Sequence, residues 1–178
     1  MLTRVAAALR DEDADLADRA LNDARDMQPL VDSMRTTANN VAEVARISPL
    51  RWRQRTHVAL YTATVIDLDN AVRDARVLAR KTSALLRHHE EVPGDMALAI
   101  DALAGAIGIF ADDLSERDDF EEARGELVQA ARMASLALPE AVTMNSASIA
   151  AQIRSLAADL LYASGYTRAE IDERLEFD

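Results

Sequence analysis

The sequence predicts an all-α protein, an elongated antiparallel bundle of about six helices, two of them very long, with a short C-terminal helix. Ala and Leu dominate a chain that is 49% hydrophobic but only 4% aromatic, a composition that suits helices and fits strands poorly. Five Gly and four Pro in 178 residues leave room for few turns, so the elements must be few and long. We expect a single domain over residues 1–178 with a sizeable core.

The longest apolar stripe lies in residues 49–86. Small or apolar residues recur there at steps of three and four, at Val58, Tyr61, Val65, Leu68, Val72, Ala75, Ala79, Thr82 and Leu86. This spacing keeps one face of a single helix apolar for about four heptads. A helix of that length reaches about 55–60 Å. Because it needs other helices along its length, we expect the bundle to be organised around it.

The other helices follow from shorter stripes and from caps. We expect helices over 2–10, 12–47, 96–114, 120–138 and 149–163, with a kink at Pro29 in the second of them. Thr167 and Glu170 form a capping box that opens the short last helix. The helix after Pro93 carries an apolar stripe that we expect to be buried, at Met96, Ile100, Leu103, Ile107, Phe110 and Leu114.

Two glycines interrupt that buried helix. Gly105 and Gly108 cost helix stability, unless a neighbouring backbone comes close at these positions. They therefore predict tight helix packing, and a ligand cavity beside the glycines and Phe110 stays open as the alternative.

Composition and spacing exclude several classes of function. The formal charge of −11 argues against broad binding to nucleic acid. The chain has no cysteine, so it has no disulfide, thiol nucleophile or Cys-ligated zinc. Adjacent His88 and His89 point about 100° apart on a helix and make a poor metal site. We see no paired catalytic groups and no phosphate loop, and expect neither an enzyme nor a cofactor.

Basic residues close together in the sequence mark one junction of this acidic chain. The cluster comprises Arg46, Arg51, Trp52, Arg53 and Arg55. Arg and Trp both suit contact with anionic lipid headgroups or with a partner. Pairing of these arginines with acids of the same bundle is the structural alternative.

Four stretches carry a family resemblance. They are ARDMQPL (24–30), ISPLRWR (47–53), AVRDARVLAR (71–80), and IAAQIRSL (149–156) continued by DLLYASG (159–165). Together they resemble the helical region of actinobacterial-type FUSC proteins, the fusaric acid resistance or aromatic acid exporter-like family. The matched features are helix-packing and capping patterns, and they extend over most of the chain.

The resemblance implies a cytoplasmic helical region that follows a set of transmembrane helices in a membrane transporter. The matching membrane half is not in this sequence, since no run of about 18 apolar residues occurs. We therefore expect an assembly or regulatory domain on the cytoplasmic side of the cell membrane, homo-oligomeric, with the transmembrane half or the membrane surface as its partner. A stand-alone bundle that binds a small hydrophobic or aromatic ligand is the alternative.

Overall fold

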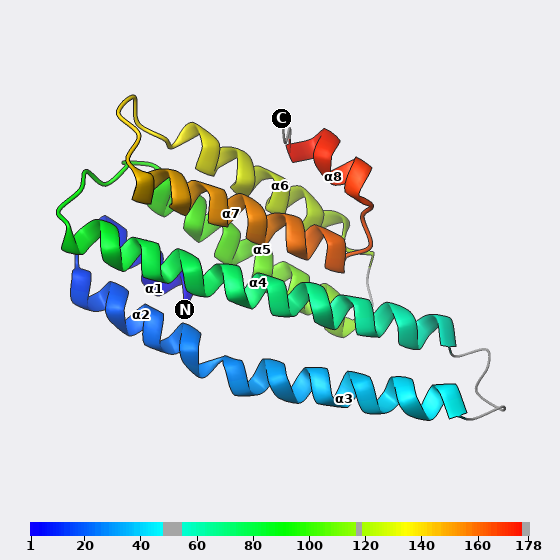
Figure 1. Cartoon of the computed structure of the whole chain (residues 1–178). Helices are drawn as coiled ribbons and strands as arrows, with labels where there is room; N and C mark the ends of the chain where they lie inside the picture. The colour runs from blue at the N-terminus through cyan, green and yellow to red at the C-terminus, as the bar shows by residue number, and fades with distance from the viewer. Residues whose placement is uncertain (48–54, 117–118, 176–178) are drawn as a thin grey trace.

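The structure is a computed structural model that describes residues 1–47, 55–116 and 119–175, without the side chains of 45–47, 55–61 and 63. The described residues form eight helices and no strand (Figure 1). The helices are α1 (Leu2–Arg10), α2 (Ala14–Asp26), α3 (Gln28–Ile47), α4 (Arg55–Arg87), α5 (Met96–Glu116), α6 (Glu121–Leu136), α7 (Met144–Ala163) and α8 (Arg168–Leu175). The prediction of an all-α bundle is confirmed.

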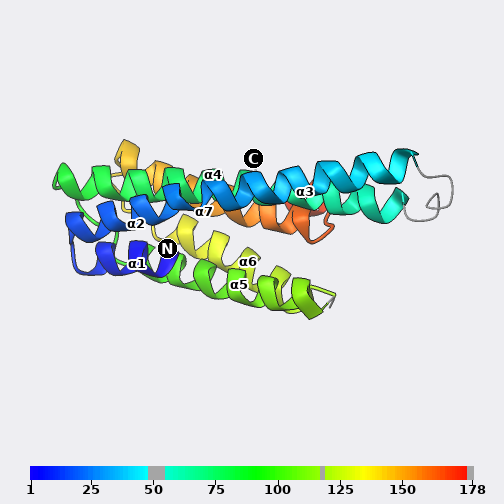
Figure 2. The same cartoon turned by 90° about the horizontal axis from the view of Figure 1, so that it is seen from below.

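The helices form an elongated, layered bundle. Seen from below, α3, α4 and α7 lie in one layer, and α5 with α6 in a second (Figure 2). The most extensive helix contact is that of α4 with α7, and α5 packs next most extensively on α6. The short helix α1 contacts α2, α4 and α5 at one end of the bundle. Beyond that end, α3 and the first half of α4 run side by side toward the opposite end (Figures 1 and 2).

The core is built from small and branched aliphatic side chains where the layers meet. On α5, Met96, Ile100 and Leu103 are fully buried. On α7, Ile149 and Ile153 are fully buried as well. Most of the buried apolar residues in the described structure are Ala or Leu, so the core resembles the composition from which it was predicted.

Three helix ends follow the capping chemistry of the sequence. The Asp13 side chain accepts a hydrogen bond from the Leu16 amide at 2.8 Å, which caps α2. Before α8, the Thr167 amide donates to Glu170 Oε2 at 2.7 Å, and the Glu170 amide donates to Thr167 Oγ1 at 3.4 Å. This confirms the predicted capping box. Gly165 follows α7 at φ +96, where a side chain would be strained.

The long second helix was predicted wrongly. A continuous helix over 12–47 with a kink at Pro29 is instead two helices that meet at Met27. Pro29 is the second residue of α3, within the first turn, where the missing amide hydrogen costs no helical hydrogen bond. Pro29 therefore starts a helix, and only α4, at 33 residues, is very long.

The apolar stripe along α5 is buried only in part, so the expectation that the whole stripe is buried is wrong. Met96, Ile100, Leu103 and Phe110 are buried, but Ile107 is half-buried and Leu114 is 44% exposed. The reason is that α4 does not cover this face of α5: within the described part of the chain, the two helices make no backbone contact. The uncovered face becomes part of the site described below.

We predict that Leu103→Ala destabilises the protein by about 2–5 kcal/mol, because a large buried side chain leaves a cavity. Leu98→Ala, on the same helix but 51% exposed, is the matched control and should cost less than about 0.5 kcal/mol. Urea denaturation followed by circular dichroism gives both values. Equal midpoints for the two variants would show that Leu103 is not in the core.

Candidate apolar groove

An apolar groove of about 550 Å³ lies between the α3–α4 pair and α5. Every lining residue but Thr3 is apolar. The lining comprises Met1, Leu2 and Thr3 at α1; Met27, Leu30, Val31 and Met34 at α3; Val65, Leu68, Ala71, Val72 and Ala75 on α4; Ala104, Ile107 and Ala111 on α5; and Leu156 and Leu160 on α7. We refer to this set as the apolar groove. Its size is within the range of ligand sites in proteins.

The groove exists because α3 has few neighbours. Among the described helices, α3 packs against α4 and, at its first residues, against α2. Apolar side chains on α3 are therefore left in contact with solvent, with Leu30 64% exposed, Val41 41% and Val44 53%. Exposed apolar side chains that share one face are typical of surfaces that contact another molecule.

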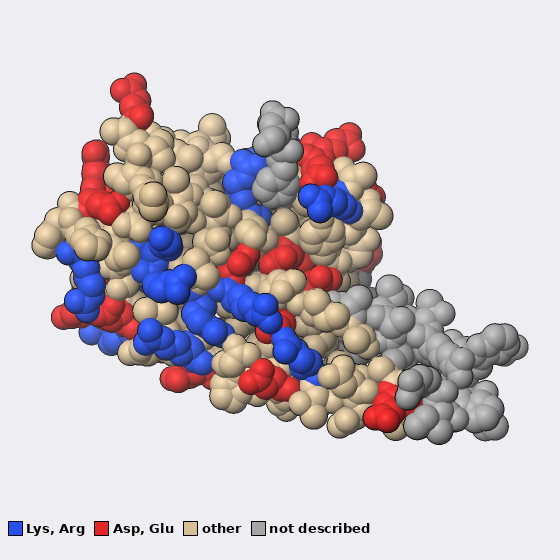
Figure 3. Space-filling view, in the orientation of Figure 1, with Lys and Arg blue, Asp and Glu red and all other residues tan. Residues whose placement is uncertain are grey.

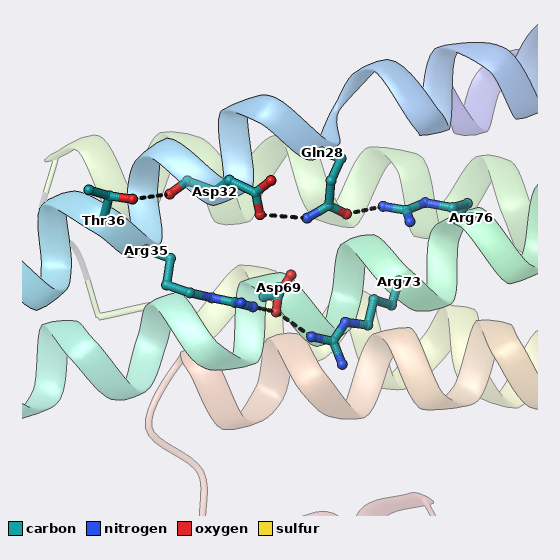
Figure 4. A network of polar contacts seen from close by, with 7 residues as sticks. All are labelled: Gln28, Asp32, Arg35, Thr36, Asp69, Arg73 and Arg76. Carbon is teal, nitrogen blue, oxygen red and sulfur yellow. Dashed lines mark hydrogen bonds and ion pairs between the residues drawn. The ribbon is translucent and has the colours of Figure 1, made fainter.

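Buried polar contacts fix α3 on α4 and so hold one wall of the groove (Figure 4). The Asp69 side chain is only 4% exposed and accepts hydrogen bonds from Arg35 of α3 and, at 2.8 Å, from Arg73. One turn further along, Gln28 accepts a hydrogen bond from Arg76 and donates to Asp32 at 2.8 Å. A carboxylate as buried as Asp69 requires its cationic partners, so these contacts specify how α3 lies on α4.

A band of basic side chains lies over the α4 face of the molecule (Figure 3). Arg73, Arg76, Arg80 and Arg87 follow one another on α4 at steps of three, four and seven, which places them on one helix face. Several are held by the protein itself: Arg87 pairs with Asp18, and hydrogen bonds from Arg87 and Ser83 lower the pKa of that carboxyl. This band was not predicted from the sequence, although the spacing of its arginines is visible there. We interpret it as structural.

Three carboxyl groups oppose one another where α4 packs on α7. Burial, together with the charges of Asp74 and Asp67 of α4, raises the pKa of Asp159 of α7 to about 7. Burial also raises the pKa of Asp67. Within the described ranges, no three His, Cys, Asp or Glu side chains lie close enough to hold a metal ion. These three carboxyl groups therefore make the stability of the protein depend on pH.

Asp159 also borders a cleft of about 800 Å³ between α6, α7 and α8, lined by both polar and apolar side chains, near Arg154 and Arg168. Arg154 donates to Ser135 Oγ and to the carbonyl oxygen of Leu175, each at 2.7 Å. Arg168 lies 3.5 Å from Asp172, a contact within α8 itself. Arg154 therefore joins α8 to the bundle, and we assign the cleft a structural role.

The prediction that the two glycines of α5 mark tight helix packing is wrong for packing within this chain. Gly105 and Gly108 are exposed, and a Cβ placed on either would meet no atom within 4 Å. They lie on the outer side of α5, next to groove residues Ala104 and Ile107, while Phe110 is buried against the ring of Phe120 at 4.9 Å. The cavity that does occur is thus lined by neighbours of the three predicted residues.

The predicted basic cluster lies outside the described residues. This applies to Arg51, Trp52 and Arg53 entirely, and to the side chains of Arg46 and Arg55, whose backbones belong to α3 and α4. Its contact with a membrane or partner stays a prediction. No described helix combines the length and the hydropathy that crossing a bilayer requires.

Comparisons with known proteins give one relative. An uncharacterized protein of Corynebacterium glutamicum is 29% identical over 174 residues, a match that spans 94% of this chain but 45% of the relative. The chain thus spans less than half the length of the curated relative it matches. No family model matches the chain. No solved structure matches it either.

We predict that Asp159→Asn stabilises the protein at about pH 8 and leaves its stability at about pH 4 nearly unchanged. Because the pKa is raised from 3.8 to about 7, the folded state binds a proton that the unfolded state has lost. Stability therefore decreases as the pH rises through this window. The side chain is only partly buried, so solvent screening reduces the expected gain to about 1 kcal/mol.

Thermal unfolding of parent and variant across that pH range measures the effect. Asp172→Asn, which removes a carboxylate from the same cleft but not from the α4–α7 contact, is the control. Parallel pH profiles for the parent and Asp159→Asn would contradict the assignment.

Proposed function

We propose that this chain is a helical assembly domain that binds another helix-forming segment and catalyses no reaction. The observation that carries the proposal is the apolar groove, which leaves large apolar side chains of α3 and α5 partly exposed. A helical bundle normally buries such faces against a further helix. The polar contacts of α3 with α4 support this proposal, since they keep the wall in place while the groove is empty.

We further propose that the domain belongs to a FUSC-like membrane transporter of the aromatic acid exporter type, on the cytoplasmic side of the membrane. The resemblance of the four sequence stretches supports this assignment. So does the Corynebacterium relative, of which more than half lies outside the match. In such a protein the transmembrane half is the partner, and the cluster from Arg46 to Arg55 is suited to anionic headgroups. Homo-oligomers are part of the same proposal.

The membrane assignment predicts where the native gene product is found. With an epitope tag at its C-terminus, the protein should be heavier than the 19.5 kDa of this chain. It should also stay in the membrane pellet after an alkaline carbonate wash, because transmembrane helices resist extraction. Immunoblots of washed membranes and of the soluble fraction measure both properties. A 19.5 kDa species found entirely in the soluble fraction would contradict the assignment.

A small hydrophobic or aromatic ligand is the second candidate occupant. The volume of the groove and its almost wholly apolar lining favour it. A helix covers a longer apolar surface than a small ligand does. The length of the apolar surface therefore distinguishes the two candidates.

A further inference from the structure

The position of α1 indicates what the groove accommodates. α1 contacts α4 on one side and α5 on the other. Its residues Val5, Ala6 and Ala8 are completely buried there. In the described structure, α4 and α5 make no backbone contact with each other. α1 therefore packs against both helices at a place where they do not contact each other directly.

The groove continues the space that α1 occupies. Its border includes Met1, Leu2 and Thr3, the first residues of α1. Its walls are the same helices that enclose α1, with Ala71 and Ala75 from α4 and Ala104 from α5. In Figure 2, α1 lies at one end of the bundle, below α2 and level with the layer of α5 and α6, and its N-terminus points toward the middle. A second helix would fit in line with α1, in the same gap.

The apolar surface is longer than a compact ligand. On α3 the stripe starts in the groove at Leu30 and Met34 and continues to the exposed Val41 and Val44. These residues lie on nearly the same helix face, and the stripe from the first to the last spans about 20 Å, or four turns. On α5, exposed Leu114 follows groove residues Ile107 and Ala111 in the same way. A helix of about 14 residues would cover this length.

Small residues at the edge of the groove on α5 suit a close helix. Ala104 and Ala111 line the groove. Gly108, at steps of four and three from them, is not part of the lining but lies next to it on the outer side of α5, where the space is open. Small residues at this spacing let a neighbouring backbone approach. The formal charge of −11 of the chain favours basic residues on the exposed face of an occupant.

We infer that the apolar groove is the binding site of an amphipathic α-helix, supplied by a partner polypeptide segment, that lies end to end with α1. The inference rests on the proposed assembly function and names its ligand. The apolar stripe of the helix replaces solvent along α3, α4 and α5, and its polar face carries Lys or Arg. In this mode of binding, apolar residues of the helix at steps of three and four are the anchors that contact the groove.

A synthetic peptide tests the inference on the 178-residue chain. The probe is a fluorescein-labelled peptide of about 14 residues with Leu at steps of three and four and Lys and Ala elsewhere. A scrambled peptide of the same composition is its control. Fluorescence anisotropy should show saturable binding of the probe. The scrambled peptide should bind at least about tenfold more weakly, because it presents no continuous apolar face.

Matched variants locate the binding site. Ile107→Glu should weaken binding about tenfold or more, because it places a charge among the apolar anchors. Leu98→Glu adds the same charge to the same helix at an exposed position away from the groove, and it should leave binding unchanged. Circular dichroism confirms that both variants stay folded. Since the peptide is basic, the added carboxylate alone would strengthen binding, so a loss reports the apolar contact.

Three results would overturn the inference. Equal binding of the scrambled peptide would mean adsorption to apolar surface, and equal binding by Ile107→Glu would place the site elsewhere. Stoichiometric dodecanoate binding that displaces the probe and is lost in Ile107→Glu would make the occupant a small apolar ligand. The fractionation experiment is independent of these results, so a soluble native protein that binds the probe would refute only the membrane assignment.

The orientation has its own test, because the chain has no cysteine. A Thr3→Cys variant should form a disulfide, by thiol–disulfide exchange, with a probe whose cysteine lies at one end, the end that meets α1, and is activated as a mixed disulfide with 5-thio-2-nitrobenzoate, which leaves as the thiolate. A central cysteine in the probe should not react. Reaction with the central cysteine alone would contradict an end-to-end arrangement.

Discussion

The packing of α4 along α7 determines where almost every other helix lies. It is the most extensive contact between helices in the described structure. Both helices carry buried alanines, with Ala71, Ala75 and Ala79 on α4 and Ala150 and Ala157 on α7, and small side chains allow close helix approach. α2 and α3 pack on α4, and α6 packs on α7. The bundle is thus assembled around one pair of helices.

The same contact carries an electrostatic cost. Burial and the negative charges of Asp74 and Asp67 of α4 raise the pKa of Asp159 of α7 to about 7. Like charges that are partly removed from water favour protonation of one of them. The stability of the central helix pair therefore depends on pH close to neutrality, whereas Asp69, which is held by Arg35 and Arg73, is compensated.

The groove lies next to the first residues of α1, with Met1, Leu2 and Thr3 at its border. In the described structure α1 contacts both α4 and α5, which do not contact each other. The groove is lined by α4 and α5 in line with α1. The polar contacts of Asp69 and Gln28 keep α3 on α4, so the outer wall does not depend on an occupant. The site is therefore preorganised for binding.

The fold class, the long α4 helix and the capping box at Thr167 were predictable from sequence, because they depend on local periodicity and on short-range hydrogen bonds. The break at Met27 was missed because Pro29 is compatible both with a kink and with a first turn. Periodicity also showed that Ile107 and Leu114 are on the apolar face of α5. It could not show that α4 stays out of contact with that face, since this depends on tertiary packing.

The glycines illustrate the same limit. Gly105 and Gly108 indicated a close approach to α5, but no neighbour within this chain makes it. Three residues around them, Ala104, Ile107 and Ala111, line the groove instead. The sequence signal was therefore near the site. The position of the cavity required the relative placement of α1, α3 and α5, to which residues far apart in sequence contribute.

Whether the channel beside α5 is open is the central claim, and thiol accessibility tests it directly. Single cysteines at Ile107, Leu103 and Leu98 in the cysteine-free chain can be alkylated with iodoacetamide under native conditions. We predict that Ile107→Cys reacts at a rate close to that of exposed Leu98→Cys. Leu103→Cys should react about two orders of magnitude more slowly, because it requires local unfolding. Protection of Ile107→Cys to the level of Leu103→Cys would show that α5 is covered and that the groove does not exist.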